Sequence, residues 1–123
     1  MSDSRQQLGR WGEQQAAVHL EAQGYKILER NWRCRRGEID LVAQAGEISV
    51  FVEVKTRRGQ GFGTPEEAIT PTKARRLLQL AQYYLMEHEL DDVEWRVDLV
   101  AVELDHEDRL IRCEHIPNAV WAW

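Results

Sequence analysis

Two short segments decide the predicted fold of this protein: Gly37-Glu38-Ile39-Asp40-Leu41-Val42-Ala43 and, a few residues later, Val50-Phe51-Val52-Glu53-Val54-Lys55. Both are alternating apolar runs, which is the pattern of β-strands with a buried face. Between them, Ala45-Gly46 is well suited to a two-residue turn. The sequence therefore predicts a β-hairpin.

The register of this hairpin brings three charged side chains together. With that turn, Asp40 lies opposite Phe51 and diagonal to Glu53. Because side chains alternate along a strand, Asp40, Glu53 and Lys55 then share one face. Glu38 lies opposite Glu53, and such a like-charge pair calls for a cation or a splayed edge.

These residue types suit metal-dependent hydrolysis of phosphodiester bonds. Asp40 and Glu53 offer hard oxygen ligands for Mg²⁺ or Mn²⁺, and we expect the Val54 carbonyl and water to complete the set. Such an ion polarises a scissile phosphate and activates its bound water. Lys55 can orient or activate that water and stabilise the developing charge. The hairpin therefore carries the parts of a metal-dependent nuclease.

The same alternation is also typical of a half-buried strand whose Glu53 and Lys55 are simply solvated. The charged face, however, also carries Phe51 and Val42. The opposite face carries the aliphatic residues Ile39, Leu41, Val50, Val52 and Val54. Both faces are therefore expected to be covered, and charges at covered positions cost free energy unless they are paired or bound to a metal.

A helix is predicted from residue 4 to about residues 21–23, with Gly24 as its stop. Its packing face is formed by Glu13, Ala16, Ala17 and Leu20, which are spaced at i, i+3, i+4 and i+7. An acid on that face has two interpretations of equal weight. Glu13 reaches the metal site, or it pairs with an arginine.

The remaining pattern predicts an α/β fold. We expect a strand over residues 25–32, a loop over 57–65, a helix from Thr70 to about His88, strands over 94–104 and 109–116, and a tail over 118–123. The tail carries Trp121 and Trp123, which are expected to pack onto the domain. The apolar stripe of the second helix is Ala74, Leu77, Leu78, Ala81 and Leu85. The predicted order is helix, three strands, helix, two strands, in a single domain of residues 1–123 with a mixed sheet between helices.

Charge is unevenly distributed along the chain. The net charge is −5, yet residues 1–80 carry 13 Lys+Arg against 10 Asp+Glu, and residues 81–123 carry 3 against 11. Basic residues flank the hairpin and begin the second helix, at Arg33, Arg35, Arg36, Arg57, Arg58 and Lys73. They are candidate phosphate contacts, because binding depends on the local field. On charge alone, a scatter of solvated side chains explains them equally well.

The composition bears on location as well. No segment is apolar enough to span a bilayer, the polar N-terminus is unlike a signal peptide, and two cysteines form no disulfide framework. We therefore expect a cytoplasmic protein without a membrane partner.

The hairpin motif resembles that of a known nuclease group. Gly37-Glu38-Ile39-Asp40 followed by Glu53-Val54-Lys55 is similar to the motif of the PD-(D/E)xK, or restriction-endonuclease-like, superfamily, with Ile39 where proline is usual. The whole chain, from Gly9-Arg10-Trp11-Gly12-Glu13 through Thr56-Arg57, resembles the YraN family of small bacterial proteins. That family is grouped with archaeal Holliday-junction resolvases, whose helix glutamate would match Glu13. Gln79-x-x-x-Tyr83 is similar to the QxxxY element of RecB-like nucleases, which makes Gln79 and Tyr83 candidate accessory residues.

The resemblance implies a restriction-endonuclease-like fold and a Mg²⁺- or Mn²⁺-dependent endonuclease acting on branched or otherwise non-B DNA. A homodimer is the assembly that resolvases use. Asp40, Glu53, Lys55 and Glu13 would be catalytic. Two alternatives stay open. The chain is a non-catalytic nucleic-acid-binding module that retains the nuclease fold, or a protein whose acidic last third docks a basic partner.

Overall fold

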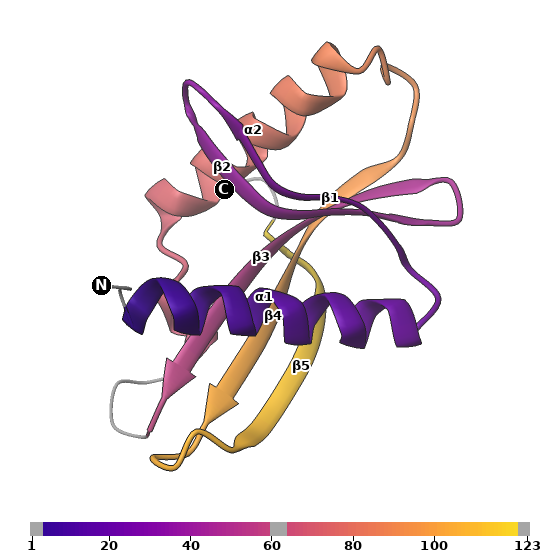
Figure 1. Cartoon of the computed structure of the whole chain (residues 1–123). Helices are drawn as coiled ribbons and strands as arrows, with labels where there is room; N and C mark the ends of the chain where they lie inside the picture. The colour runs from indigo at the N-terminus through magenta and orange to yellow at the C-terminus, as the bar shows by residue number, and fades with distance from the viewer. Residues whose placement is uncertain (1–3, 60–63, 121–123) are drawn as a thin grey trace.

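A five-stranded sheet lies between two helices (Figure 1). A computed structural model describes residues 4–59 and 64–120 of the chain. The elements are α1 (Ser4–Ala22), β1 (Lys26–Cys34), β2 (Gly37–Ala45), β3 (Ile48–Arg58), the 3₁₀ helix η1 (Pro65–Ala68), α2 (Pro71–Glu87), β4 (Trp95–Leu104) and β5 (Leu110–Val120). The predicted α/β class and the order of helices and strands are confirmed. Within the described residues, no helix is long and apolar enough to cross a membrane.

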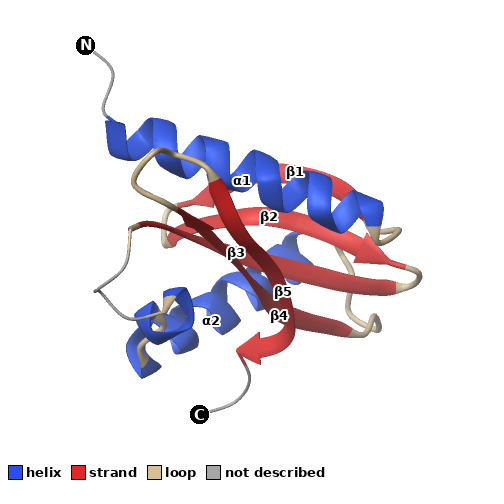
Figure 2. Ribbon diagram, turned by 90° about the horizontal axis from the view of Figure 1, so that it is seen from below, coloured by secondary structure: helices blue, strands red, loops and turns tan. Residues whose placement is uncertain are grey.

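The sheet is mixed and its strands lie in chain order, β1-β2-β3-β4-β5. Only β3 and β4 run parallel, whereas the other neighbouring pairs are antiparallel. A parallel pair needs a crossover connection, and α2 lies in it. The crossover places α2 on the sheet face opposite α1, so that the sheet is covered on both sides (Figure 2).

The predicted pairing of the two hairpin strands is wrong by two residues, and the predicted turn is wrong by one. Ala45 pairs with Ile48 and Leu41 with Val52, so the turn is Gly46-Glu47. Gly46 has φ 61°, a conformation that glycine adopts without strain and that alanine avoids. With Ala45-Gly46 at the centre, Ala45 would have needed that conformation. The shift moves Asp40 from opposite Phe51 to one step beyond the last pair, level with Glu53.

The antiparallel pairing of β2 with β3 ends at Leu41 and Val52. Beyond that point, β2 continues to pair with β1 on its other side, and Glu38 pairs with Arg33. The predicted apposition of Glu38 and Glu53 is therefore wrong. The physical reason is that β2 separates from β3 before Glu38 is reached, which opens the sheet between these two strands.

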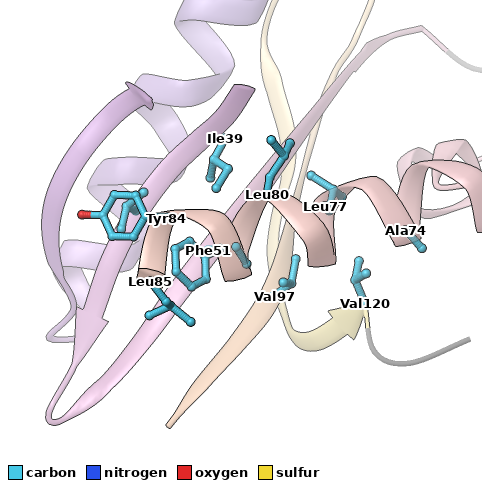
Figure 3. Packing of buried hydrophobic residues seen from close by; sticks show 11 residues of the cluster. Ile39, Phe51, Ala74, Leu77, Leu80, Tyr84, Leu85, Val97 and Val120 are labelled. Atoms are coloured by element: carbon cyan, nitrogen blue, oxygen red, sulfur yellow. The ribbon is translucent and has the colours of Figure 1, made fainter. Parts of the chain in front are cut away.

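Two apolar clusters fill the spaces between the sheet and the helices. The cluster between the sheet and α2 consists of Ile39, Val42, Phe51, Ala74, Leu77, Leu80, Ala81, Tyr84, Leu85, Val97 and Val120 (Figure 3). The cluster between the sheet and α1 consists of Ala16, Ala17, Leu20, Leu41, Ala43, Val50, Val52, Val54, Val100 and Val102. Ile39 was expected to share a face with Leu41, yet it packs with Val42 and Phe51. The simple alternation of faces is therefore interrupted between Ile39 and Val42, where β2 leaves β3.

The packing face of α2 is wider than the predicted stripe. Leu80 and Tyr84 are buried as well, whereas Leu78 is only partly buried. Tyr84 tolerates burial because its hydroxyl donates a hydrogen bond to Glu29 Oε2 at 2.8 Å. Its ring also packs edge-on against Phe51, with the ring centroids 5.4 Å apart.

The end of β5 is held by a buried carboxylate. Asp98 is fully buried and accepts hydrogen bonds from Arg96 Nε at 3.0 Å, His115 Nε2 at 2.6 Å and the Asn118 backbone N–H at 2.8 Å. Burial alone would raise the pKa of Asp98, but these hydrogen bonds outweigh it and hold the pKa below its usual value. Because Asn118 is tied down and Val120 pairs with Val97, residues 118–120 belong to β5 and the predicted tail is wrong there. The predicted packing of Trp121 and Trp123 lies outside the described residues.

Helix α1 approaches β3 closely at Gly12. A Cβ atom on Gly12 would lie 1.9 Å from Thr56 Oγ1 and 3.0 Å from Thr56 Cβ, whereas a Cβ on Gly9 would meet nothing within 4 Å. Close approach of helix to strand is therefore possible only because residue 12 has no side chain.

We expect Gly12→Ala to lower the free energy of unfolding by about 1–3 kcal/mol, because the added methyl overpacks the contact. The matched control Gly9→Ala should raise it by up to about 1 kcal/mol through helix propensity. Urea unfolding of both variants checks this. A Gly12→Ala protein as stable as Gly9→Ala would contradict the contact.

Candidate functional site

A cavity of about 490 Å³ lies where β2 separates from β3. Its walls come from the first half of α1, from β2 and β3, and from the first turn of α2. It is lined by Arg5, Leu8, Gly9, Glu13, Asp40, Glu53, Val54, Lys55, Thr56, Arg57 and Lys73. The structure thus brings together the four predicted catalytic residues, Asp40, Glu53, Lys55 and Glu13.

Asp40 takes the place of a strand neighbour at the opening of the sheet. Its Oδ2 accepts a hydrogen bond from the Val54 backbone N–H at 2.8 Å. Burial, followed by the charge of Glu53 and the hydrogen bond between the two carboxyl groups, raises the pKa of Asp40 to about 9. In the metal-free protein at neutral pH, Asp40 therefore holds a proton that a bound cation would displace.

Glu53 is held by two lysines. Its Oε2 lies 2.8 Å from Lys73 Nζ and 3.5 Å from Lys55 Nζ, and the residue is only 6 % exposed. Burial alone would raise the pKa of Glu53, but the hydrogen bonds from Asp40 and Lys73, together with the charges of Lys73 and Lys55, outweigh it and lower the pKa. The negative charge of the buried Glu53 is therefore balanced by the two lysine side chains.

The two lysines differ in their tendency to keep a proton. Burial, the hydrogen bond with Lys73 and the Lys73 charge lower the pKa of Lys55, although Glu53 opposes the shift. Burial would lower the pKa of Lys73 too, but its hydrogen bonds with Glu53 and Lys55 outweigh burial and raise the pKa. Lys55 is therefore the more easily deprotonated of the two lysines. A side chain that takes a proton from water must be able to lose its own proton first.

Three carboxylates can meet one cation. One oxygen from each of Glu13, Glu38 and Asp40 lies within 4.8 Å of the other two, and none of these side chains is fully buried. Burial raises the pKa of Glu13, against the hydrogen bond of Asn31, and the charges of Glu38 and Glu53 add to the rise. A set of hard oxygen donors at this spacing fits Mg²⁺ or Mn²⁺.

This set differs from the predicted ligands Asp40, Glu53 and Val54. Asp40 is common to both sets, and Glu53 lies at the side of the cluster with its Oε2 on Lys73. Val54 lines the cavity and gives its N–H to Asp40. The role of its carbonyl as a ligand stays a prediction.

The sequence marked Glu38 only as a like charge opposite Glu53 that calls for a cation or a splayed edge, and did not include it among the predicted ligands. For Lys73 it predicted phosphate contact alone. The period of a strand could have found Glu38, because residues two apart on a strand point to one face and Glu38 precedes Asp40 by two. No local signal could have found the contact of Lys73 with Glu53. It depends on how the crossover after β3 returns α2 to the sheet.

The predicted phosphate-binding residues lie in different environments. Arg57 lines the cavity, and its Nε is buried without a hydrogen-bond acceptor among the residues the structure describes. Arg33 pairs with Glu38 at 3.5 Å, and Arg58 pairs with Asp108 at 2.6 Å beside the β4–β5 turn. Exposed positions at the β1–β2 turn hold Arg35 and Arg36. The structure therefore brings Arg57 and Lys73 to the cavity and holds Arg58 at another partner.

The candidate accessory residues lie on α2, outside the cavity. Gln79 is exposed, and Tyr83 packs beside Trp32 with ring centroids 6.2 Å apart. Neither residue lines the cavity described above. Their resemblance to a nuclease element is thus not accompanied by proximity to Asp40 and Glu53.

Comparison with known proteins places the chain in a family. The sequence model of the uncharacterised protein family UPF0102 matches residues 12–102. A UPF0102 protein of Roseiflexus castenholzii is 46 % identical over 121 residues, which cover 98 % of each chain. One from Symbiobacterium thermophilum is 52 % identical over 115 residues, covering 94 % of this chain and 97 % of the relative. The expected resemblance to the YraN group is confirmed at this level, and the chain belongs to the UPF0102 family.

Proposed function

We propose that this protein is a Mg²⁺- or Mn²⁺-dependent endonuclease of the restriction-endonuclease-like superfamily, acting on branched or otherwise non-B DNA. The observation that carries the proposal is the convergence of Glu13, Asp40, Glu53 and two lysines in one cavity. A carboxylate oxygen of Glu38 lies close enough to those of Glu13 and Asp40 to share a cation with them. The grouping of the YraN family with archaeal Holliday-junction resolvases supports the choice of substrate.

The residues present fit a divalent ion. Glu13, Glu38 and Asp40 would hold it, and Glu53 could join them if Lys73 released its Oε2. The ion would supply Lewis-acid polarisation of the scissile phosphate and a more acidic bound water.

Side chains of the cavity account for the other tasks of hydrolysis. Lys55, with its lowered pKa, is placed to take a proton from the attacking water or to orient it. Lys73 and Arg57 offer cationic donors to the phosphate oxygens as negative charge builds up on them. Asp40, fixed by the Val54 N–H, keeps the carboxylate cluster in place while the substrate binds.

Paired cuts in a four-way junction need two active sites, so we propose that a homodimer acts on that substrate. Arg35, Arg36 and Arg33 at the β1–β2 turn would contact the phosphates of the flanking arms in a salt-dependent way. Sedimentation of the protein with and without junction DNA measures the stoichiometry.

The test is cleavage of labelled four-way junction, flap, single-stranded and duplex DNA in Mg²⁺, in Mn²⁺ and in EDTA. We expect metal-dependent cutting, with the duplex cut least. Glu47→Gln is a matched control, because Glu47 is an exposed acid in the hairpin turn outside the cavity. Folded protein that cuts none of these DNAs would refute the nuclease. Salt-dependent DNA binding without cutting would instead support a non-catalytic binding module.

A further inference from the structure

A second cavity, of about 450 Å³, adjoins the first and shares Glu53 and Lys73 with it. It lies between the start of β2 and the first turns of α2. Besides Glu53 and Lys73, its lining includes Glu38, Thr72, Arg76, Leu77 and Leu80. The proposed hydrolysis uses Glu38, Glu53 and Lys73 but gives no task to the other residues of this cavity.

The lining combines two kinds of surface. Thr72 and Arg76 are exposed at the rim, whereas Leu77 and Leu80 are buried and close the inner end. Its volume lies within the range of about 300–1,000 Å³ that is usual for sites binding small organic groups. The carboxylates of Glu38 and Glu53 also line the cavity and can accept hydrogen bonds from amino groups of a ligand. An aliphatic inner end with charged and polar groups around it suits a ligand that is flat and apolar on its face and polar at its edge.

A nucleotide with an unpaired base has this chemistry. The bases of intact duplex DNA are stacked on one another, so the protein meets only phosphates and base edges. A base that has left the stack exposes its faces, and apolar side chains can cover them. A cavity that served only the phosphate backbone would need cations but no aliphatic inner end.

The shared wall fixes where such a nucleotide would lie. Lys73 borders both cavities and contacts Glu53 at 2.8 Å. A phosphate bound at Lys73 would therefore join a nucleotide on one side to a nucleotide on the other. Arg76 lies one helical turn further along α2, on the rim of the second cavity alone, and offers a bidentate donor to the next phosphate or to a base edge.

We propose that the second cavity binds the unpaired nucleotide next to the scissile phosphate, with Arg76 and Thr72 at its edge and Leu77 and Leu80 against its base. The inference rests on the proposed nuclease function and narrows its substrate to nucleic acid that is single-stranded at the cut, such as a flap or a loop. Junctions and duplexes are then cut only where a nucleotide is unpaired.

The experiment uses two variants that alter the cavity at exposed positions and so should not disturb folding. Arg76→Ala removes the guanidinium group at the rim, and Thr72→Trp fills the cavity with a large side chain. Arg75→Ala and Arg75→Trp are the matched controls, since Arg75 is exposed on the same helix and lines neither cavity. Thermal unfolding confirms that all four proteins are folded.

Two readouts are compared, binding and cleavage. Binding of a fluorescein-labelled single-stranded oligonucleotide and of a hairpin duplex is measured by anisotropy in EDTA. Cleavage of a flap is measured in Mg²⁺. We expect Arg76→Ala and Thr72→Trp to weaken single-strand binding about tenfold or more relative to the Arg75 controls, and to slow flap cleavage. Duplex binding should change equally in each cavity variant and its control.

The outcomes separate this inference from the function on which it rests. Wild-type protein that cuts the flap, with cavity variants indistinguishable from the Arg75 controls, overturns the nucleotide cavity and leaves the nuclease standing. Wild-type protein that cuts no DNA overturns the nuclease, and the nucleotide cavity as stated falls with it. Equal loss of single-strand and duplex binding in the cavity variants also overturns it, because that result indicates a phosphate contact alone.

Discussion

Asp40→Asn should abolish metal-dependent cleavage while leaving the protein folded, and we expect a loss of about 10³-fold or more. An ion at a phosphoryl centre contributes several kcal/mol of charge stabilisation, and each 1.4 kcal/mol lost is about tenfold in rate. The asparagine side chain keeps an oxygen that can accept the Val54 N–H, so the sheet opening is preserved. Initial rates on the preferred DNA measure the loss, with Glu47→Gln as the control that should cut like wild type.

The same substitution should stabilise the metal-free protein in a pH-dependent way. The pKa of Asp40 rises from 3.8 to about 9 on folding. Between these values the folded protein keeps a proton that the unfolded chain has released, so wild-type stability falls as pH rises. The amide introduced by Asp40→Asn does not titrate, so the variant lacks this dependence.

We therefore expect Asp40→Asn and wild type to be similar near pH 4, and the variant to be more stable by about 1–4 kcal/mol near pH 8. Urea unfolding in EDTA at both pH values measures the difference. A variant that is less stable than wild type at pH 8 would show that Asp40 is not a strained carboxyl. Cleavage by the variant at the wild-type rate would show that Asp40 is not a catalytic residue.

Lys73→Met is expected to have the second-largest effect. It removes the ammonium 2.8 Å from Glu53 Oε2 and, among the described residues, leaves Lys55 at 3.5 Å as the paired cation. Because Glu53 is buried, the lost charge-assisted hydrogen bond should lower the free energy of unfolding by about 1–3 kcal/mol in EDTA. Cleavage should fall about 10²-fold, since a donor to the phosphate is lost.

Divalent ions should partly reverse the loss of stability in this variant. With Lys73 gone, Glu53 becomes available to a cation, so Mn²⁺ should raise the melting temperature of Lys73→Met more than that of wild type. Lys73→Arg, which keeps the charge, should behave like wild type in EDTA. Arg75→Met is the matched control, because it removes an exposed charge of the same helix that does not line the cavity. An identical Mn²⁺ response in Arg75→Met and Lys73→Met would contradict the role of Lys73.

Much of the fold could be predicted because the apolar pattern is clear in α2, in the two hairpin strands and in β4. The hairpin register could not be settled in that way. A slip of two residues keeps each side chain on the same face, so the apolar pattern of Leu41, Val42, Val52 and Phe51 fits both registers. Only the positive φ needed in the turn distinguishes them, and it favours Gly46 over Ala45 in the first central position.

The candidate site was predictable to the extent that it lies on neighbouring strands. Asp40, Glu53 and Lys55 meet because a hairpin joins them, and a two-residue slip brings Asp40 closer to Glu53 rather than separating them. Lys73 could not be placed against Glu53, because the contact depends on the path of the crossover between β3 and α2. Tyr84 was left out of the core because its hydroxyl partner, Glu29, lies 55 residues away in sequence.

The Val54 N–H has a use beyond holding Asp40. This peptide group faces the carboxylate on one side, and on the other side its residue pairs with Val100 in the parallel strand β4. Its ¹⁵N and ¹H resonances therefore respond to the binding of a proton or a cation by Asp40. In ¹⁵N-labelled protein, a single backbone amide can thus report the protonation and the metal occupancy of the cavity before any substrate has been added.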